Sequence, residues 1–487
     1  MMRMIYMLTD LLMPMWRKIS MSYNILQQDI DILFQSQKQI FSRVEILDSN
    51  YKTIIGLEGI LISDSYSINA ESDIRRSYSC DIFLENDSYF INKRYELMKK
   101  YIRPYVGIKY IRTGEIIWYL MGTYCFTETS WVYNNVSHTL SLSCEDMMCL
   151  LNGTISGNTT DNKIKIVAGE NIRDSFLLLL DAANIKKHLL LSIDKYIPYD
   201  LEFSGTTYYE ILKEMLDLYP GYEMFFDVNG IFVVQKIPTG RYDENLINDK
   251  IIQPLLISDN GSFSFSGIYN HIKVYGMEIE TDYDSTSCTY SGNVYNASFD
   301  TLTSLENTAT YSVTIPSSNL YNARLNINGI GARNIVVDDG VIIQAGVLQS
   351  GKYSFRYRKL TDDFLLLGKY QVFGEAYNIN PNHPFSINNL GFEIVKICQG
   401  DEYEKLYTDD LAKQMAEYEL YMSSDLQENI SLEMINIPWL DVNCKIEYTS
   451  KNFNETYSYI VKSISGSTSS AAMNISMIKY YIPYSET

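Results

Sequence analysis

IWYLMGTYCFTETSWVYNNVSHTLSLSCEDMMCLL, residues 117–151 of the chain, holds the strand pattern that recurs along most of this protein. In HTLSLSCE (138–145), the apolar residues Leu140, Leu142 and Cys144 alternate with polar ones. Successive side chains of a strand point to opposite faces of a sheet, so this alternation predicts a strand with one buried and one solvated face. The stretch therefore indicates antiparallel β structure.

The same stretch contains Cys125, His138, Cys144 and Cys149, which raises the alternative of a metal site. Cys144 continues the apolar face of its strand, and Cys149 follows Asp146, a suitable N-cap for a short helix over DMMCLL. The spacing of the four residues matches no usual zinc finger or knuckle. We expect buried free thiols, which is how unpaired cysteine usually behaves, and no metal.

Length and composition indicate a folded protein of several domains. The chain has 487 residues, 46% of them hydrophobic, which suits about three domains of roughly 100 to 200 residues each. It has 59 acidic and 40 basic side chains, and the resulting net charge of -19 opposes binding to a polyphosphate backbone. The seven cysteines are an odd number without a CxxC pair, which favours assembly in a reducing compartment.

Targeting and membrane signals are weak. The N-terminal run MMRMIYMLTDLLMPMWRKISM is interrupted by Asp10 and Pro14, and no small-residue cleavage pattern follows it. No stretch approaches the roughly 20 apolar residues of a spanning helix, so we expect a soluble chain. Residues 1–39 are interpreted as an N-terminal extension, and whether the first 20 belong to the native protein is left open.

Working outward from residues 117–151, the range 40–151 is predicted to form a first tube-like β-barrel domain from several strand-like runs. Residues 152–280 predict an α+β middle domain. It includes helices at 169–185 and 207–220, the second with Thr207 and Glu210 placed as a capping box, and a hairpin around Asn229-Gly230. Residues 281–381 contain only strand-length segments and predict an inserted β-sandwich-like module.

Residues 382–487 are predicted to form a second tube-like β-barrel domain with a helix at 408–424. The apolar stripe of that helix is Leu411, Met415, Tyr418 and Met422. GSTSS, residues 466–470, is predicted to be a flexible tip between the last two strands. Trp439 follows Pro438 at the entry to a strand and is interpreted as a structural anchor in the core, with a ligand-stacking platform as the alternative.

Motifs of catalysis are missing from the sequence. It has no GxGxxG, phosphate loop, HExxH, GxSxG or EF-hand loop, and its four histidines are dispersed. Loop carboxylate pairs have no opposing acid that can be placed, which disfavours a glycosidase dyad. We predict a protein that is not an enzyme, with no catalytic, cofactor-binding or metal-binding residues.

Several segments, taken in order, resemble the tail-hub proteins of bacteriophages with Gram-positive hosts, a family similar in fold to the central baseplate hub of contractile tails. They are residues 116–153, YEMFFDVNGIFVVQKIP, SGIYNHIKVYG, IPWLDVNCKIEY and YSYIVKSISGSTSSAAMNISMIKYY. LNINGIGARNIVV and DGVIIQAGVLQSGKYSFRYR resemble small β modules of phage tail fibres and spikes, and here they interrupt the hub pattern.

The resemblance implies a fold that is mainly β with α+β parts, and a homotrimer. Its two tube-like domains per chain would form a pseudo-sixfold ring joining the tail tube and distal tail proteins to a spike or fibre below. Such a protein would belong to the virion and assemble in the cytoplasm of the host bacterium. The negative charge suits a conduit, because acidic side chains facing a lumen repel DNA phosphates.

Two alternatives remain beside this structural hub. The module at 281–381 could bind a glycan of the host surface through its Tyr-rich loops. A tail-associated cell-wall hydrolase would need a positioned nucleophile, a zinc triad or an acid pair, and the sequence offers none of these.

Overall fold

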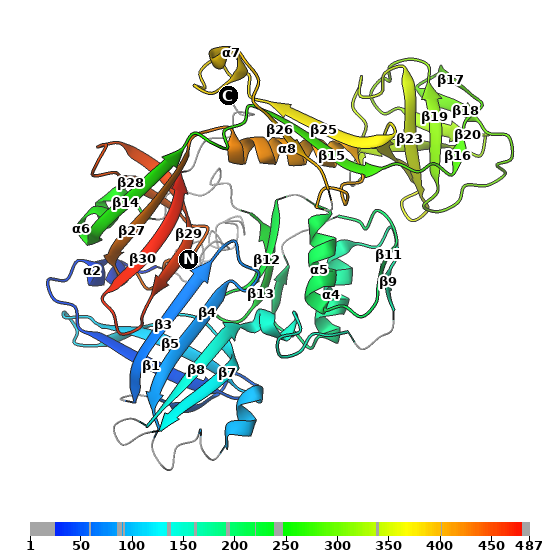
Figure 1. The fold of residues 1–487 in the computed structure, drawn as a ribbon. Coiled ribbons are helices and arrows are strands. Elements are labelled where there is room, and N and C mark those ends of the chain that lie inside the picture. Colours follow the sequence, from blue (N-terminus) through cyan, green and yellow to red (C-terminus); the bar gives the residue numbers. More distant parts are fainter. Residues whose placement is uncertain are drawn as a thin grey trace, which may run out of the picture.

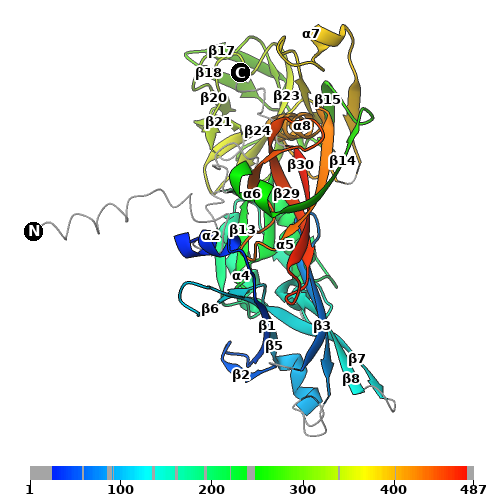
Figure 2. The same cartoon turned by 90° about the vertical axis from the view of Figure 1, so that its left-hand side faces the viewer.

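The computed structural model describes residues 25–57, 60–84, 90, 93–133, 138–159, 163–190, 195–219, 221–237, 247–337, 340–400 and 402–479 (Figure 1). Strands predominate, with a few helices in the middle of the chain and near its C-terminal end (Figures 1 and 2). This confirms the predicted fold class, mainly β with α+β parts. Residues 1–24 and 480–487, which belong to the first and last predicted ranges, lie outside the described residues.

Within the described part of the chain, the largest sheet has 13 strands and combines both ends of the sequence. Across the sheet its main path runs β14 (Leu256–Ser264), β27 (Gln427–Ile435), β30 (Ala472–Lys479), β29 (Thr456–Gly466), β3 (Leu61–Asn69), β4 (Arg76–Phe83), β8 (His138–Asp146), β7 (Tyr124–Tyr133), β5 (Tyr101–Lys109), β1 (Ile40–Leu47) and β2 (Thr53–Gly56). Strands β28 (Lys445–Thr449) and β6 (Ile116–Leu120) branch from β29 and β5.

Two four-stranded units of the same order lie side by side in this sheet. The first unit is β3-β4-β8-β7 and the second is β14-β27-β30-β29. Each contains a hairpin, β7–β8 or β29–β30, whose second strand pairs with the middle strand β4 or β27. The strands that flank the hairpins agree as well, because β5 pairs with β7 as β28 pairs with β29. The two units therefore share one topology.

The registers of the two units also coincide. Cys80 of β4 lies opposite Asp64 and Leu142, and Leu432 of β27 lies opposite Asp259 and Ile475. The register shifts fall at matching places, which are Leu61/Ser63 and Leu256/Ser258 in the outer strands and Phe126/Glu128 and Val461/Ser463 in the hairpins. β-Bulges are specific local features, so shared bulges mark equivalent strands.

Strand β14 corrects one predicted boundary. Its residues, 256–264, fall inside the range assigned to the middle domain, yet β14 pairs with β27 over nearly its whole length. The elements from β15 (His271–Glu278) to α8 (Asp409–Ser423) separate these two strands in the sequence. A strand cannot be assigned to a sheet from its own sequence when its partner lies this far away, because the local pattern gives only its buried face.

The middle of the chain packs against one end of this sheet (Figure 1). Helices α4 (Ile172–Ala182) and α5 (Tyr208–Asp217) lie beside a small sheet of β10 (His188–Leu190), β13 (Phe232–Lys236) and β12 (Tyr222–Phe226). Thr207 and Glu210 form the predicted capping box of α5. The β12–β13 turn holds Asn229-Gly230, with Gly230 at φ +77°.

The strand-rich segment after Thr281 forms a sheet of its own at the far end of the molecule (Figure 1). Its strands are β16 (Tyr283–Asp284), β17 (Ser287–Ser291), β18 (Val294–Ser298), β19 (Thr310–Ile315), β20 (Arg324–Ile327), β21 (Ala332–Val337), β22 (Val341–Ile342), β23 (Gly351–Arg358) and β24 (Asp363–Gly368). The next strand, β25 (Gln371–Tyr377), leaves this module and pairs with β15. The module enters and leaves at adjacent points, since Ile279 N donates to Tyr370 O over 3.0 Å.

Helix α8 forms where predicted, but its buried face differs from the predicted stripe. Thr408 caps it through Leu411 N, and the buried face comprises Leu411, Ala412, Ala416 and Leu420, whereas Met422 is exposed. The helix packs on β25 at Gly374, where an added Cβ would lie 2.2 Å from the backbone of Ala412. Small residues are buried here because only they allow so close an approach of helix and strand.

Residues 25–39 are packed, although the sequence predicts an extension. Helix α2 (Gln27–Leu33) buries Ile32 and Leu33 in the core of the large sheet. Asp29 is also buried, and Tyr119 Oη donates to its Oδ1 over 2.8 Å. This helix covers part of the sheet's apolar face.

Candidate functional surface

One face of the two units is lined with small polar side chains that oppose one another from strand to strand. We call it the polar face. The longest row crosses seven strands and consists of Ser258, Glu433, Asn474, Ser465, Ser67, Ser77 and Glu145. Neighbouring rows are Asn260, Ser431, Ser476, Ser463, Asn69; Ser65, Ser79, Ser143, Glu128; and Ser63, Asp81, Ser141, Ser130.

The rows combine hydroxyl, amide and carboxylate groups. Ser65 and Ser79 share a hydrogen bond of 2.8 Å between their hydroxyls. Asp81 accepts from the hydroxyls of Ser63 at 2.8 Å and Ser141 at 2.5 Å. All the charged members of these four rows are carboxylates, so this surface is weakly acidic. Burial raises the pKa of one of them, Glu145.

A shallow groove of about 510 Å³ follows the polar face where the two units meet. Its lining includes Ser67, Ser77, Ser143, Glu145 and Ser465, which come from both units. The opposite face of the same strands is apolar and forms one continuous core, which includes Tyr66, Ile68, Leu142, Leu432 and Ile475. The sheet is thus amphipathic across both units, as strict alternation requires.

The two units join where β3 pairs with β29. The ladder is short and antiparallel, from Ser463 opposite Asn69 to Gly466 opposite Tyr66. Gly466 is required there, because an added Cβ would lie 2.8 Å from Tyr66 Oη. In the middle of this junction Ile464 and Ile68 face each other, and both are 2% exposed.

The turn after β29 also fastens this junction, although the sequence predicts a flexible tip at 466–470. Thr468 is fully buried, and its backbone N donates to Asp64 Oδ1 over 3.0 Å. Ser467 donates its hydroxyl to the same oxygen at 2.5 Å. The prediction is wrong because Asp64, which lies far away in the sequence, supplies the acceptors that hold the turn.

A buried ionic network crosses the same junction. Arg76 of β4 is 2% exposed, and its Nη2 lies 2.5 Å from Asp441 Oδ2. Its backbone N donates to Asp146 Oδ2 over 2.9 Å. Burial disfavours the charged guanidinium, but Asp441 outweighs this and the pKa of Arg76 is raised. The pair therefore ties the first unit to the loop that precedes β28.

A second pair extends the network to the middle of the chain. Arg75 contacts Glu223 of β12 in a buried ion pair, and its guanidinium lies 3.7 Å from the centre of the Phe225 ring. Glu223 also accepts from Gln235 at 2.7 Å and from Asn443 at 3.1 Å. One carboxylate thus joins three parts of the molecule, which positions the middle segment against both units.

Trp439 lies in the core beneath the sheet. It is 6% exposed, and its ring centre is 5.5 Å from that of Tyr119 in β6. The contact joins a loop of the C-terminal part to a strand of the N-terminal part. Its role as a structural anchor stays a prediction about stability.

The cysteines of residues 117–151 are divided between two cores. Cys144 belongs to the core of the large sheet, whereas Cys125 and Cys149 belong to the core shared with the middle helices. A hydrogen bond with Cys125 and burial both raise the pKa of the Cys149 thiol. His138 begins β8 and packs edge-on against Tyr133, with ring centres 5.1 Å apart. Among the described residues, no three His, Cys, Asp or Glu side chains converge as metal ligands would.

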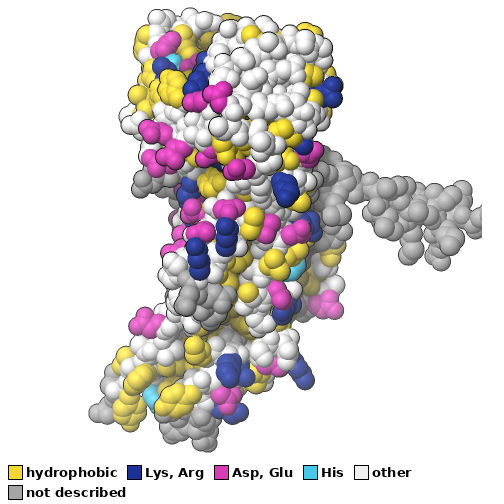
Figure 3. All heavy atoms as spheres, turned by 90° about the vertical axis from the view of Figure 1, so that its right-hand side faces the viewer, with side chains coloured by type: hydrophobic (Ala, Val, Ile, Leu, Met, Phe, Trp, Pro, Cys, Tyr) yellow, Lys and Arg dark blue, Asp and Glu magenta, His cyan; other side chains and the backbone are white. Residues whose placement is uncertain are grey.

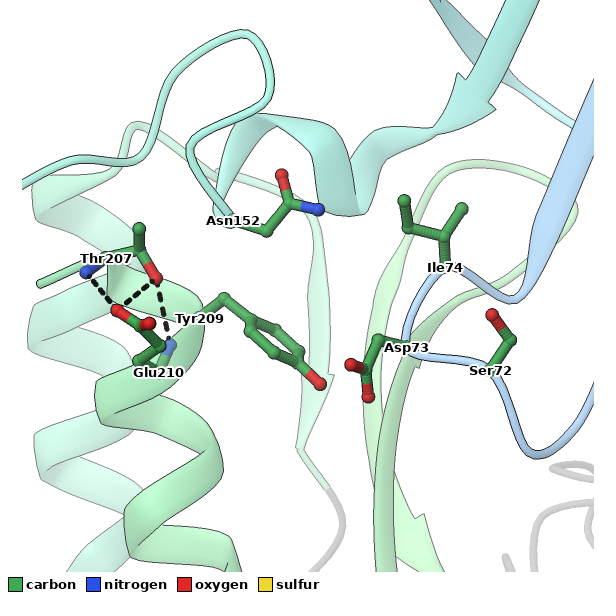
Figure 4. Close-up of a pocket in the computed structure, with 7 residues that line it drawn as sticks. All are labelled: Ser72, Asp73, Ile74, Asn152, Thr207, Tyr209 and Glu210. Carbon is green, nitrogen blue, oxygen red and sulfur yellow. Dashed lines mark hydrogen bonds between the residues drawn. The ribbon is translucent and has the colours of Figure 1, made fainter.

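A separate pocket of about 380 Å³ lies between the turn after β3 and the start of α5 (Figure 4). Tyr209 points across it toward Asp73, and burial raises the pKa of its phenol. Glu210 is engaged in the helix cap, where it accepts from Thr207 N over 2.8 Å. The pocket is therefore a polar gap in the packing between the first unit and the middle segment.

Two loops of the inserted module carry an exposed apolar group of Leu320, Tyr321 and Val347, which we call the module tip. Buried Asn319 holds its two loops together by donating to Gln344 O over 2.7 Å and accepting from Leu348 N over 2.9 Å. Asn293 donates to the carbonyl of Tyr321 over 2.7 Å. The tip is thus exposed and fixed at the same time.

Sequence reasoning missed the polar face and the pairing of the two units. A signal was present, because β3 and β14 both begin with LISD, at residues 61–64 and 256–259. The serine alternation in β3, β4 and β8 was a second signal. Both become informative only once the strands are known to be neighbours.

A family model described as a domain of unknown function (DUF5048) matches residues 382–484. None of the curated proteins compared with this chain matches it in sequence. No helix within the described residues is long and apolar enough to cross a membrane.

Several solved structures are similar over most of their length. The 43 kDa tail protein of prophage MuSo2 from Shewanella oneidensis is 10% identical, with 91% of this chain and 98% of that chain covered and a TM-score of 0.49. A tail protein from Neisseria meningitidis MC58 is 9% identical, with 91% and 97% covered and a TM-score of 0.46. Prophage tail protein gp18 from Listeria monocytogenes EGD-e is 9% identical, with 89% and 94% covered and a TM-score of 0.45.

Proposed function

We propose that this chain is a structural protein of a phage tail tip or baseplate, and that three copies form a ring joining the tail tube to the spike. The observation that carries the proposal is the pair of like four-stranded units joined edge to edge by β3 and β29. A chain with two equivalent units supplies six units per trimer, which would match a sixfold tube above while keeping threefold symmetry below.

The polar face supports a conduit for DNA. It is continuous across both units, and the charged members of its four rows are carboxylates. Turned toward a lumen, such a surface gives phosphates no cationic partner and repels them weakly, so DNA would pass without binding. The overall charge of -19 has the same sign.

The oligomeric mass tests this function. Light scattering of the purified full chain, over a range of concentrations that includes those of tail assembly, should give three times the chain mass of 56.2 kDa. A mass of one chain at every concentration would count against the ring.

The module tip favours a second function, adsorption to a neutral glycan of the host surface. Leu320 and Tyr321 are exposed, and a tyrosine ring offers an apolar face together with a polar hydroxyl, which suits contact with a sugar. A Leu320→Ser/Tyr321→Ser variant should assemble normally and lose adsorption to host cells. Unchanged adsorption would leave only the hub function.

A further inference from the structure

The second unit has an edge that lacks the partner found at the equivalent edge of the first. Among the described residues, β14 pairs with β27 on one side and with no strand on the other. Its counterpart β3 pairs on both sides, with β4 and β29. An exposed edge strand presents unpaired N–H and C=O groups and is a template for another strand.

The first unit has the complementary free edge. Past its first residues, β7 has β8 as its one strand partner within the described part of the chain. Its counterpart in the second unit, β29, uses the same edge to bind β3. Among the described residues, the second unit thus has a β3-like edge, and the first unit a β29-like edge, without a neighbouring strand, although the 3₁₀ helix at Arg94–Lys99 contacts β7.

We propose that β14 of one copy pairs with β7 of the next copy in the register that joins β3 to β29 within a chain. This inference rests on the proposed ring and names its subunit contact. By the shared registers, the expected pairs are Ser264 with Glu128, Phe263 with Thr129, Ser262 with Ser130 and Gly261 with Trp131 of the neighbouring copy.

The side chains at the two free edges suit this register. At the junction within the chain, Gly466 makes room for the ring of Tyr66. At the proposed junction Trp131 is equivalent to Gly466, and Gly261 is equivalent to Tyr66. A ring therefore again lies opposite a glycine, but here the ring belongs to the β29-like strand and the glycine to the β3-like strand. Trp131 is 73% exposed, which leaves its ring free to cover that glycine.

Apolar side chains at these edges are exposed, which also supports the proposed contact between copies. Ile68 is 2% exposed at the junction within the chain, whereas Phe263 at the equivalent position of β14 is 50% exposed. Ile257 of β14 and Phe265, the residue directly after that strand, are exposed too. Figure 3 shows hydrophobic side chains gathered at the lower end of the molecule, where the β7–β8 hairpin projects in Figure 1. Joining the edges would cover apolar groups from both.

The register also preserves both faces of the sheet. Ser130 and Ser262 lie on the polar face, next to Ser141 and Asn429, while Trp131 and Phe263 lie on the apolar side. A head-to-tail contact that repeats the junction already present within each chain gives every unit an equivalent neighbour. Such a heterologous contact closes into a ring when its rotation permits.

Disulfide trapping tests the register. In a Ser130→Cys/Ser262→Cys variant the two new thiols would be direct cross-strand neighbours, with Cβ atoms about 4.5 to 5.5 Å apart. A mild oxidant such as diamide should then convert them to disulfides between chains, giving covalent dimers and trimers on a non-reducing gel that return to monomers on reduction. Each single variant should stay uncrosslinked.

Two matched controls use the same strands. Ser67→Cys/Ser465→Cys, at the junction seen within the chain, should crosslink without forming multimers. Ser130→Cys/Ser258→Cys should not crosslink. Ser258 lies four strand residues, or about 13 Å, from Ser262, which is the expected partner of Ser130. Trp131→Asp gives an independent measurement, since it should retain the folded circular-dichroism spectrum and shift the scattering mass toward one chain.

The outcomes separate the two proposals. A trimer without a Ser130–Ser262 crosslink would contradict the β14–β7 contact but not the ring. The same holds if the Ser130/Ser258 pair of cysteines crosslinks equally well. A monomer at every concentration overturns both. Trimers with the predicted crosslink establish the contact.

Discussion

Arg76 and Asp441 lie 2.5 Å apart across the junction of the two units, one on β4 and the other in the loop before β28. Because Arg76 is almost fully buried, the pair is shielded from solvent and depends on its own geometry. The same arginine positions Asp146 through its backbone N. The junction is therefore held by charge as well as by the β3–β29 ladder.

Removing Arg76 should destabilise the fold strongly. In Arg76→Ala the carboxylate of Asp441 loses its buried partner, and we expect the free energy of unfolding to fall by roughly 3 to 5 kcal/mol. Lys186→Ala is the control, since Lys186 and Asp181 form a solvent-exposed pair that should contribute little to stability. Urea denaturation of both variants measures the difference, and equal losses would contradict the role of the network.

Truncating Trp439 tests whether it anchors the core. Trp439→Ala leaves a cavity beside Tyr119, and we expect a loss of roughly 3 to 5 kcal/mol in the free energy of unfolding. Tyr370→Ala removes a ring that is 81% exposed and should change stability by at most about 0.5 kcal/mol. If the melting temperature of Trp439→Ala stayed that of the wild type, the ring would not be a core anchor.

Asp146 should make stability depend on pH. Burial raises its pKa to about 6, against 3.8 for an ordinary aspartate. The folded protein therefore takes up this proton at a higher pH than the unfolded chain does. The resulting stabilisation is complete below about pH 4 and is lost as the pH rises through about 6.

Asp146→Asn removes this titration while keeping a side chain that can cap the following 3₁₀ helix. Relative to the variant, the wild-type free energy of unfolding should increase by roughly 1 to 3 kcal/mol as the pH is lowered from 7 to 4. Denaturation curves at several pH values in that range supply the measurement. A difference that does not vary with pH would show that Asp146 titrates normally.

Gly374 should tolerate no side chain. In Gly374→Ala the new Cβ would lie 2.2 Å from the backbone of Ala412, so α8 must move away from β25, at a cost of roughly 1 to 3 kcal/mol or more. Gly56→Ala is the matched control in another strand, because nothing lies within 4 Å of the added Cβ. Thermal unfolding should separate the two variants, and similar midpoints would argue against tight packing of α8.

The sequence by itself determined the local elements, for reasons that lie within a few residues. Alternation in HTLSLSCE fixed which face of β8 is buried, and Thr207 with Glu210 fixed the start of α5. Asn229-Gly230 marked the β12–β13 turn, because a turn depends on the backbone freedom of its own residues. The predicted apolar stripe of α8 was wrong because the helix packs closely on β25 at Gly374, where only small side chains fit.

Only the tertiary structure decided which strands are neighbours. LISDSYSIN and LISDNGSFS are similar strands, yet one is enclosed between β4 and β29, whereas the other pairs with a strand on one side only in the part of the chain that the structure describes. Thr468 is buried because Asp64, at the other end of the chain, accepts its N–H. Ladder pairing across hundreds of residues follows from the packing of the whole chain, so the polar face and its junctions exist only in the folded molecule.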